Sequence, residues 1–309
     1  MPVQPVCRLS AFGLDIEADF PLPGAYALTA PSAERKLTLT LVELQELVPL
    51  ASEERVLRYL HVFDGRPFAM LESRAGDILF QYGGWALFHL SADRSLLRCA
   101  PAAGTDLAWR RVLLDTVLWT VSLLRGFELL HASAVATPTG IIAFVAISGG
   151  GKTSLAAECL RRGAPLFCDD VLALDDPEGQ VVGHPGPPLM NLPLSIMAES
   201  LGGAQVIAHF GDEQWVQIAV PPTDSQPMAA IVLTHRAQEE QAQCSAIKAT
   251  NFTLLPHAFR LPHLEQRTRR RFELFAMLAL TTPVLRLSAD PSVPTKDLVD
   301  LVEEQVSLR

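Results

Sequence analysis

Alternating hydrophobic and polar positions dominate the first third of the chain and predict β-strands there. In the run KLTLTL, which begins at Lys36, leucines alternate with threonines in the period-two pattern of a half-buried strand. The run DILFQYGGWALFHL places two apolar, aromatic-rich segments on either side of Gly83-Gly84, which predicts a tight hairpin. Residues 1–105 are therefore expected to form a smaller, β-rich N-terminal domain.

Beyond residue 105 the pattern changes to helical spacing and then to alternating strands and helices. A helix is expected over residues 107–124, because Arg125-Gly126 supplies a basic residue and a stop glycine at its end. The strand-like runs LLHASAVA and GIIAFVAI follow, and a second helix is expected from Lys152 to about Arg162. The runs APLFCDDVLAL, AAIVLT and TPVLRLS predict further strands, whereas proline-rich GHPGPPLMNLP, residues 183–193, predicts a loop. Residues 106–309 are therefore expected to form one α/β (α+β) domain.

Charge and cysteine usage narrow the classes of partner and compartment. The 309 residues carry a net charge of −9, which disfavours nucleic acid or an anionic membrane as the main partner. The five cysteines show no CxxC spacing, which favours a reducing compartment over a disulfide framework. No signal peptide is expected. The most hydrophobic stretch of the chain is shorter than the roughly 20 residues that a membrane-spanning helix needs. We therefore expect a cytoplasmic protein.

The run AFVAISGGGKTS, which begins at Ala143, has the composition of a phosphate-binding loop. Glycines between a strand and a helix let successive backbone N–H groups turn toward an anion at the positive end of the helix. A lysine would reach the β and γ phosphates, and a hydroxyl would hold magnesium. The expected nucleotide-binding residues are Ser148, Gly149, Gly150, Gly151, Lys152, Thr153 and Ser154.

This loop departs from the usual Gly-x-x-x-x-Gly-Lys-[Ser/Thr] pattern at one position. Ala146 stands where the first glycine belongs. Alanine is compatible with the loop if residue 146 keeps a negative φ, because glycine is needed chiefly where φ is positive. The alternative interpretation is a glycine-rich turn with an incidental lysine.

A pair of aspartates follows the loop helix at the end of the next predicted strand. Asp169 and Asp170 come soon after Lys152, so their carboxylates are expected at the same sheet edge as the phosphates. One carboxylate can bind magnesium, and the other can accept a proton from an acceptor hydroxyl. A base beside a phosphate cradle favours a kinase. The alternative for such a pair is a solvated turn.

Together these residues resemble a known family. Residues 129–174 look like the catalytic core of the HPr kinase/phosphorylase family, whose fold is similar to that of phosphoenolpyruvate carboxykinase, with its phosphate-binding P-loop. More narrowly, the β-rich front half, LLHASAV and the chain length resemble HPr-kinase-related proteins found with asparagine-synthetase-like and lasso peptide biosynthesis genes. Those proteins are thought to phosphorylate a serine on a ribosomal peptide. The front half departs from the α/β regulatory domain of the true bacterial HPr kinases.

The resemblance implies roles for four side chains. Asp169 would be the catalytic base, Asp170 would help to position the magnesium that the Thr153 hydroxyl of the loop is expected to hold, and His131 would lie close to the phosphates. For His131 a core histidine that closes a strand is the alternative. The family also uses an arginine downstream of the aspartates, and Arg260 is the candidate here.

The function expected from the sequence is an ATP-dependent, Mg²⁺-requiring serine kinase that acts on a peptide or small protein, such as a lasso precursor peptide. GTP in place of ATP and a homo-oligomer are options that the sequence leaves open. A nucleotide-binding sensor without phosphoryl transfer and a kinase for a small hydroxyl metabolite are the alternatives. The cluster RTRRR, residues 267–271, could hold an acidic group or form the exposed start of a helix, and the histidines lack the spacing of zinc ligands.

Overall fold

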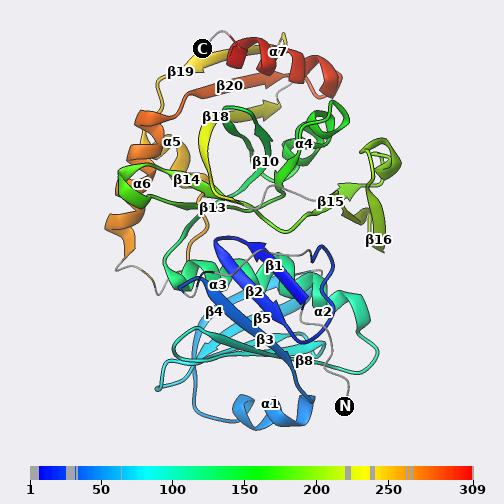
Figure 1. The fold of residues 1–309 in the computed structure, drawn as a ribbon, viewed down its shortest axis with the longest axis vertical. Coiled ribbons are helices and arrows are strands. Elements are labelled where there is room, and N and C mark those ends of the chain that lie inside the picture. The colour runs from blue at the N-terminus through cyan, green and yellow to red at the C-terminus, as the bar shows by residue number, and fades with distance from the viewer. Residues whose placement is uncertain are drawn as a thin grey trace. The chain divides into compact units, whose positions relative to one another are not determined.

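The chain is a mixed α/β protein that divides into two compact units. The computed structural model describes residues 7–25, 32, 34–63, 65–219, 224–236, 241–261, 264 and 267–307. The first unit comprises Met1–Gly126 with Arg260–Gln266, and the second comprises Phe127–Phe259 with Arg267–Arg309. Figure 1 labels many of the elements of both units.

An eight-stranded sheet forms the body of the first unit. Its strand order is β1-β2-β3-β8-β7-β6-β5-β4. The elements are β1 (Cys7–Ala11), β2 (Leu14–Ala18), β3 (Lys36–Leu41), α1 (Leu44–Ala51), β4 (Val56–Phe63), β5 (Arg66–Glu72), β6 (Ile78–Tyr82), β7 (Ala86–Leu90) and β8 (Leu96–Pro101). The expected hairpin is confirmed, because β6 pairs with β7 antiparallel across Gly83-Gly84, and both glycines have positive φ.

The helix expected over residues 107–124 is present and belongs to the first unit. It consists of α2 (Asp106–Val112), a π-helical turn η1 (Leu113–Val117) and α3 (Leu118–Arg125), and it ends at Gly126 with φ 115°. The Trp109 ring lies 5.4 Å from that of Phe20, and the Ser122 hydroxyl donates to the Phe12 carbonyl at 2.6 Å. These contacts hold the helix to the N-terminal strands, so the compact units divide after Gly126 rather than near residue 105.

A nine-stranded sheet forms the centre of the second unit. Its order is β12-β10-β11-β18-β14-β13-β9, with β20 pairing to β18 and β19 pairing to β20. The strands are β9 (Glu128–Leu130), β10 (Ala132–Thr137), β11 (Gly140–Val145), β12 (Leu166–Cys168), β13 (Leu172–Asp175), β14 (Val182–His184), β18 (Gln226–Arg236), β19 (Gln243–Ile247) and β20 (Val284–Ala289).

A smaller three-stranded sheet, in the order β15-β17-β16, corrects one expectation. Its strands are β15 (Leu189–Pro193), β16 (Gln205–Phe210) and β17 (Glu213–Gln217). The loop predicted over residues 183–193 was therefore wrong at both ends, where β14 and β15 lie. Within β15, the buried Met190 and Leu192 alternate with the more exposed Asn191 and Pro193. This is a strand pattern, and the surrounding prolines concealed it.

Helices cover both faces of the nine-stranded sheet. On one face α4 (Lys152–Arg161) and α7 (Thr295–Ser307) pack in a single apolar cluster with β15, and on the other lie α5 (Asn251–Leu254) and α6 (Thr268–Thr281). Short 3-10 turns lie at η2 (Pro177–Gly179), η3 (Ala198–Ser200) and η4 (Leu255–His257).

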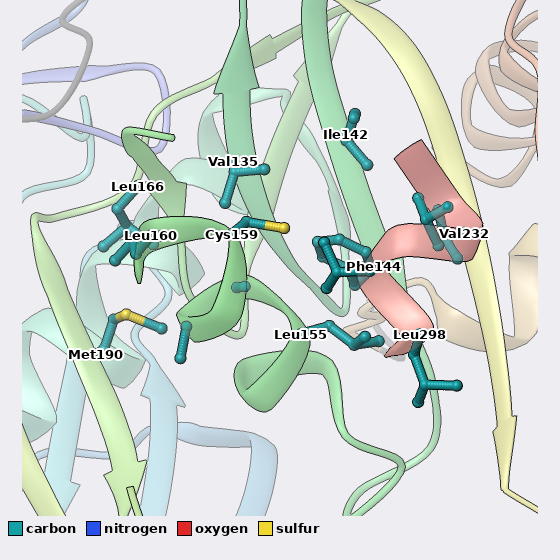
Figure 2. Packing of buried hydrophobic residues seen from close by; sticks show 14 of the residues in the cluster. Val135, Ile142, Phe144, Leu155, Cys159, Leu160, Leu166, Met190, Val232 and Leu298 are labelled. Atoms are coloured by element: carbon teal, nitrogen blue, oxygen red, sulfur yellow. The ribbon is translucent and has the colours of Figure 1, made fainter. Parts of the chain in front are cut away.

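Strand β11 fixes the start of α4 because its side chains enter both cores. Ile142 and Phe144 pack in the cluster with α4, whereas Ile141, Ala143 and Val145 pack in the opposite cluster. Figure 2 shows Leu155 and Cys159 of α4 in the first of these clusters. Full burial of one such aliphatic or aromatic side chain stabilises the fold by about 1.5–3 kcal/mol. The segment between β11 and α4 is therefore anchored at both ends.

Among the helices in the described ranges, none combines the length and apolar composition needed to cross a bilayer.

Candidate functional site

The site begins at one edge of the nine-stranded sheet, where three parallel strands end. Strand β10 is antiparallel to both β11 and β12, and β11 is parallel to β18, so β12, β11 and β18 point the same way. Asp169-Asp170 follow β12, the glycine loop follows β11, and β18 ends at Arg236. In open α/β sheets, the carboxyl ends of parallel strands form the usual binding edge.

The glycine loop turns sharply between β11 and α4. Gly149 and Gly151 have φ of 76° and 90°, values that side chains rarely permit, and the Gly150 N–H donates to the Ile147 carbonyl at 3.0 Å. Helix α4 begins at Lys152, so the unpaired N–H groups of its first turn lie beside the loop. This combination of loop and helix N-terminus suits an anion.

Ala146 fits the loop without strain. It is not among the described residues with positive φ, so the condition under which alanine can replace the first glycine is met. A Cβ on Gly150 would lie 2.5 Å from the Cβ of Ala146. Residue 150 must therefore be glycine as long as residue 146 is alanine.

Lys152 is buried in the wall of a pocket of about 290 Å³. Only 6% of the residue is exposed, and no carboxylate of the described residues forms an ion pair with its ammonium. A buried cation without a partner is costly, so the arrangement suits an anion bound from outside the chain. The other lining residues are His131, Ser148, Gly149, Gly151, Thr153, Ser154, Asp170, Asn191, Pro193 and Glu213.

Asp169 is held by three hydrogen bonds. Its Oδ1 accepts from the Ser133 hydroxyl at 2.6 Å and from the Thr153 hydroxyl at 3.1 Å, and its Oδ2 accepts from the Asn191 N–H at 3.0 Å. Burial and the charge of Asp170 raise the pKa of Asp169 to about 7, against the opposing effect of these bonds. The carboxyl thus links β10, β15 and the start of α4.

Asp170 lies in a tight turn and faces the pocket. The Val171 N–H donates to the Asp169 carbonyl at 2.7 Å, and Asp170 between them has φ 60°, which is the rare form of the γ-turn. The His131 Nε2 lies 3.6 Å from the Asp170 Oδ1, and the His131 ring meets the edge of Phe259. Both His131 and Asp170 line the pocket, whereas Asp169 lies behind Thr153.

The predicted site residues thus divide into those that the structure brings together and one that it does not. Ser148, Gly149, Gly151, Lys152, Thr153 and Ser154 share one pocket with His131 and Asp170. Gly150 lies within the loop, and Asp169 contacts Thr153. Arg260 is exposed and groups with the other compact unit, so its role stays a prediction.

Sequence reasoning did not single out several residues at this edge. Asn191, Pro193 and Glu213 line the pocket from the three-stranded sheet, and Ser133 lies buried under Asp169. Ser133 had a visible signal, because it is the polar residue in the otherwise apolar strand ASAVA. The other three come from distant segments that only tertiary packing brings to the pocket.

The arginine cluster at residues 267–271 is engaged in ion pairs. Arg267 and Arg271 each lie 2.7 Å from a carboxylate oxygen of Glu128, which is fully buried. Arg270 pairs with Asp175 and Asp176, and Arg269 pairs with Glu273 one helical turn on. The cluster therefore braces α6 against β9 and β13. It is the start of a helix, as expected, but Arg267 and Arg271 are largely buried against Glu128 rather than exposed.

Comparison with known proteins finds likenesses among solved structures. No family model matches the chain, and no curated protein matches it. The solved structures with similarity include the Hpr(Ser) kinase/phosphatase from Coxiella burnetii, at 14% identity and a TM-score of 0.31. The match covers 58% of this chain and 94% of that one. A likeness at this level carries no inference about activity.

Proposed function

We propose that the chain is an ATP-dependent kinase that transfers the γ-phosphoryl group to a hydroxyl. The observation that carries the proposal is the pocket in which the glycine loop and Lys152 share a wall with Asp170 and His131. The Lys152 ammonium is buried there and has no ion-pair partner among the residues that the structure describes. Phosphoryl transfer depends mainly on positioning and charge stabilisation, together with a base that takes the proton from the hydroxyl to be phosphorylated. Both requirements have residues here.

The residues present fit a nucleotide with Mg²⁺. The positive φ of Gly149 and Gly151 and the first turn of α4 supply N–H donors, and Lys152 supplies the cation. In the described part of the chain no three His, Cys, Asp or Glu side chains form a metal cluster of their own. Mg²⁺ keeps several waters and uses few protein ligands beside the phosphates, which matches the Thr153 hydroxyl that Asp169 orients. When bound, the metal would neutralise charge on the phosphates.

The geometry favours separate tasks for the two aspartates. Asp169 orients the Thr153 hydroxyl, and its own oxygens are taken up by Ser133, Thr153 and Asn191. Asp170 faces the pocket beside His131 and can accept the acceptor proton while the acceptor oxygen bonds to phosphorus and ADP leaves. We therefore propose Asp170 as the base, a role that the family resemblance gives to Asp169.

The acceptor class in this proposal is a serine of a peptide or small protein. It rests on the resemblance in sequence, including the narrower resemblance to proteins of lasso peptide gene clusters. The wall formed by Asn191, Pro193 and Glu213 offers polar contacts beside the phosphate loop for such a chain.

A direct transfer assay tests the proposal. Protein, Mg²⁺ and γ-labelled ATP are applied to an array of serine-containing peptides, with serine-to-alanine copies of each peptide as the matched control. We expect labelled serine peptides that disappear with Lys152→Ala and persist with Lys248→Ala, an exposed lysine of the same unit.

Two outcomes would contradict the kinase assignment. Labelling undiminished by Lys152→Ala would place the activity elsewhere. Tight ATP binding in calorimetry without transfer to any peptide, free serine or sugar would instead favour a nucleotide sensor.

A further inference from the structure

Arg236 lies at the same sheet edge as the glycine loop, on the side away from the aspartates. It is the last residue of β18, which is the parallel neighbour of β11, whereas Asp169-Asp170 follow β12 on the other side of β11. The loop therefore lies between an acidic flank and an arginine. No sequence motif pointed to Arg236, because its place depends on pairing between strands far apart in the chain.

The guanidinium of Arg236 approaches the residue that begins α4. Its Nε and Nη2 lie 3.7 and 3.8 Å from the point where a Cβ on Gly151 would be. The glycine leaves this space to the arginine. Gly151 is also the N-cap residue of α4, so the guanidinium lies beside the helix N-terminus.

One nitrogen of the guanidinium is anchored, and the others retain donors. Nη1 donates to the Asp290 carbonyl at 3.2 Å, which fixes the side chain against the end of β20. Among the described residues, Nε and Nη2 have no hydrogen-bond acceptor, although a guanidinium carries five N–H donors. Partial burial lowers the pKa of Arg236, with Asp290 opposing the shift, so an added anion would offset the cost of desolvation.

We propose that Arg236 is a second phosphate-binding cation, which contacts the polyphosphate of the nucleotide from the β18 side of the loop. The inference rests on the proposed function, because it assigns a further ligand to the same nucleotide. Arginine suits this task because its planar fork can donate two parallel hydrogen bonds to one phosphate. In an acidic chain, Lys152 and Arg236 would then attract the phosphates from two sides.

The test compares binding of ATP and of inorganic tripolyphosphate, each with Mg²⁺, by calorimetry. Arg236→Met should lower the affinity for both ligands by about 10- to 100-fold, the range expected for hydrogen bonds to a charged group. Arg236→Lys keeps the charge without the fork and should give a smaller loss. Arg286→Met is the matched control, since Arg286 is an exposed arginine of β20 in the same sheet, and it should bind both ligands like the wild type.

The outcomes separate the inference from the proposed function. Unchanged binding by Arg236→Met, with binding lost in Lys152→Met, overturns the inference and leaves the kinase proposal intact. Weakened ATP binding with unchanged tripolyphosphate binding also overturns it, because the contact would then be to base or ribose. Failure of the wild-type protein to bind either ligand defeats the proposed function itself. If Arg236→Met does not fold by circular dichroism, Arg236→Lys decides, and unchanged affinity in that variant counts against the inference.

Discussion

The Thr153 hydroxyl donates a hydrogen bond of 3.1 Å to the Asp169 Oδ1, which ties the first turn of α4 to the end of β12. Strand β10 lies between β11, which leads into α4, and β12, so this bond joins segments that follow two strands not adjacent in the sheet. Because the same oxygen accepts from Ser133, the position of Thr153 depends on three separate segments. Through this bond Asp169 supports the loop from behind Thr153, whereas Asp170 lines the pocket.

Exchanging each aspartate for asparagine should separate their roles. With Asp170→Asn we expect labelled peptide to fall by about 10²- to 10⁴-fold, the usual contribution of a general base, while calorimetric ATP affinity stays near that of the wild type. Asp169→Asn should weaken Mg²⁺-dependent ATP binding, because the asparagine NH₂ would face the Asn191 N–H or the hydroxyl donors. Wild-type transfer in Asp170→Asn, with transfer alone lost in Asp169→Asn, would return the base role to Asp169.

Ser133→Ala should lower both stability and nucleotide affinity. Asp169 loses the Ser133 hydroxyl but keeps the Thr153 hydroxyl on the same oxygen. A hydrogen bond to a charged group contributes about 1.5–3 kcal/mol to the free energy of unfolding, which urea titration measures. Ser122→Ala is the matched control, because Ser122 is a buried serine of the first unit that donates to the Phe12 carbonyl. We expect Ser122→Ala to lower stability without changing affinity for Mg²⁺-ATP. Equal affinities in the two variants would show that Ser133 has no influence on the site.

Local signals in the sequence predicted the part of the site that is continuous in the chain. The glycines, Lys152 and Thr153 follow one another, so strand, loop and helix could be recognised together. The pocket wall of Asn191 and Glu213 could not be predicted, since β15 and β17 meet only through pairing of distant segments. The proline content also concealed β15, because prolines at residues 185, 187 and 188 precede a strand that pairs along its whole length with β17.

Gly150→Ala should damage the loop, and Ala146→Gly should repair part of the damage. The added Cβ would lie 2.5 Å from that of Ala146 and 3.0 Å from the Ile147 carbonyl oxygen, so the double variant removes only the closer clash. Thermal unfolding and tripolyphosphate binding of the single and double variants measure the repair. If the double variant is no better than Gly150→Ala, the carbonyl of Ile147 is the contact that excludes a side chain.

Glu128→Gln should destabilise the second unit strongly. Arg267 and Arg271 both depend on this buried carboxylate, and removing one partner of a buried ion pair costs about 3–5 kcal/mol. Glu273→Gln breaks the exposed pair with Arg269 and should leave the free energy of unfolding nearly unchanged. Similar urea midpoints for the two variants would mean that the arginines find other acceptors.

The first unit should lose stability in acid through Asp77. Partial burial raises the pKa of this carboxyl, but hydrogen bonds from Ser73, Arg55 and His89 outweigh burial and lower the pKa to about 2. A carboxyl whose folded pKa is depressed stabilises the fold above its unfolded pKa, and that stabilisation disappears as the pH falls toward 2. Asp77→Asn should therefore be less stable than wild type at neutral pH, with the gap in urea midpoint closing in acid. A gap independent of pH would exclude this linkage.

The division of the chain into units has a consequence for how the protein can be dissected. Residues 260–266 return to the first unit after the chain has built most of the second. An expressed fragment that stops at Gly126 therefore lacks residues 260–266 of its own unit. A fragment that starts at Phe127 contains these residues, which group with the other unit. Recombination that exchanges the N-terminal unit between relatives must transfer two separate stretches of the gene. The first unit is thus discontinuous in the chain, and a single cut does not separate the two units.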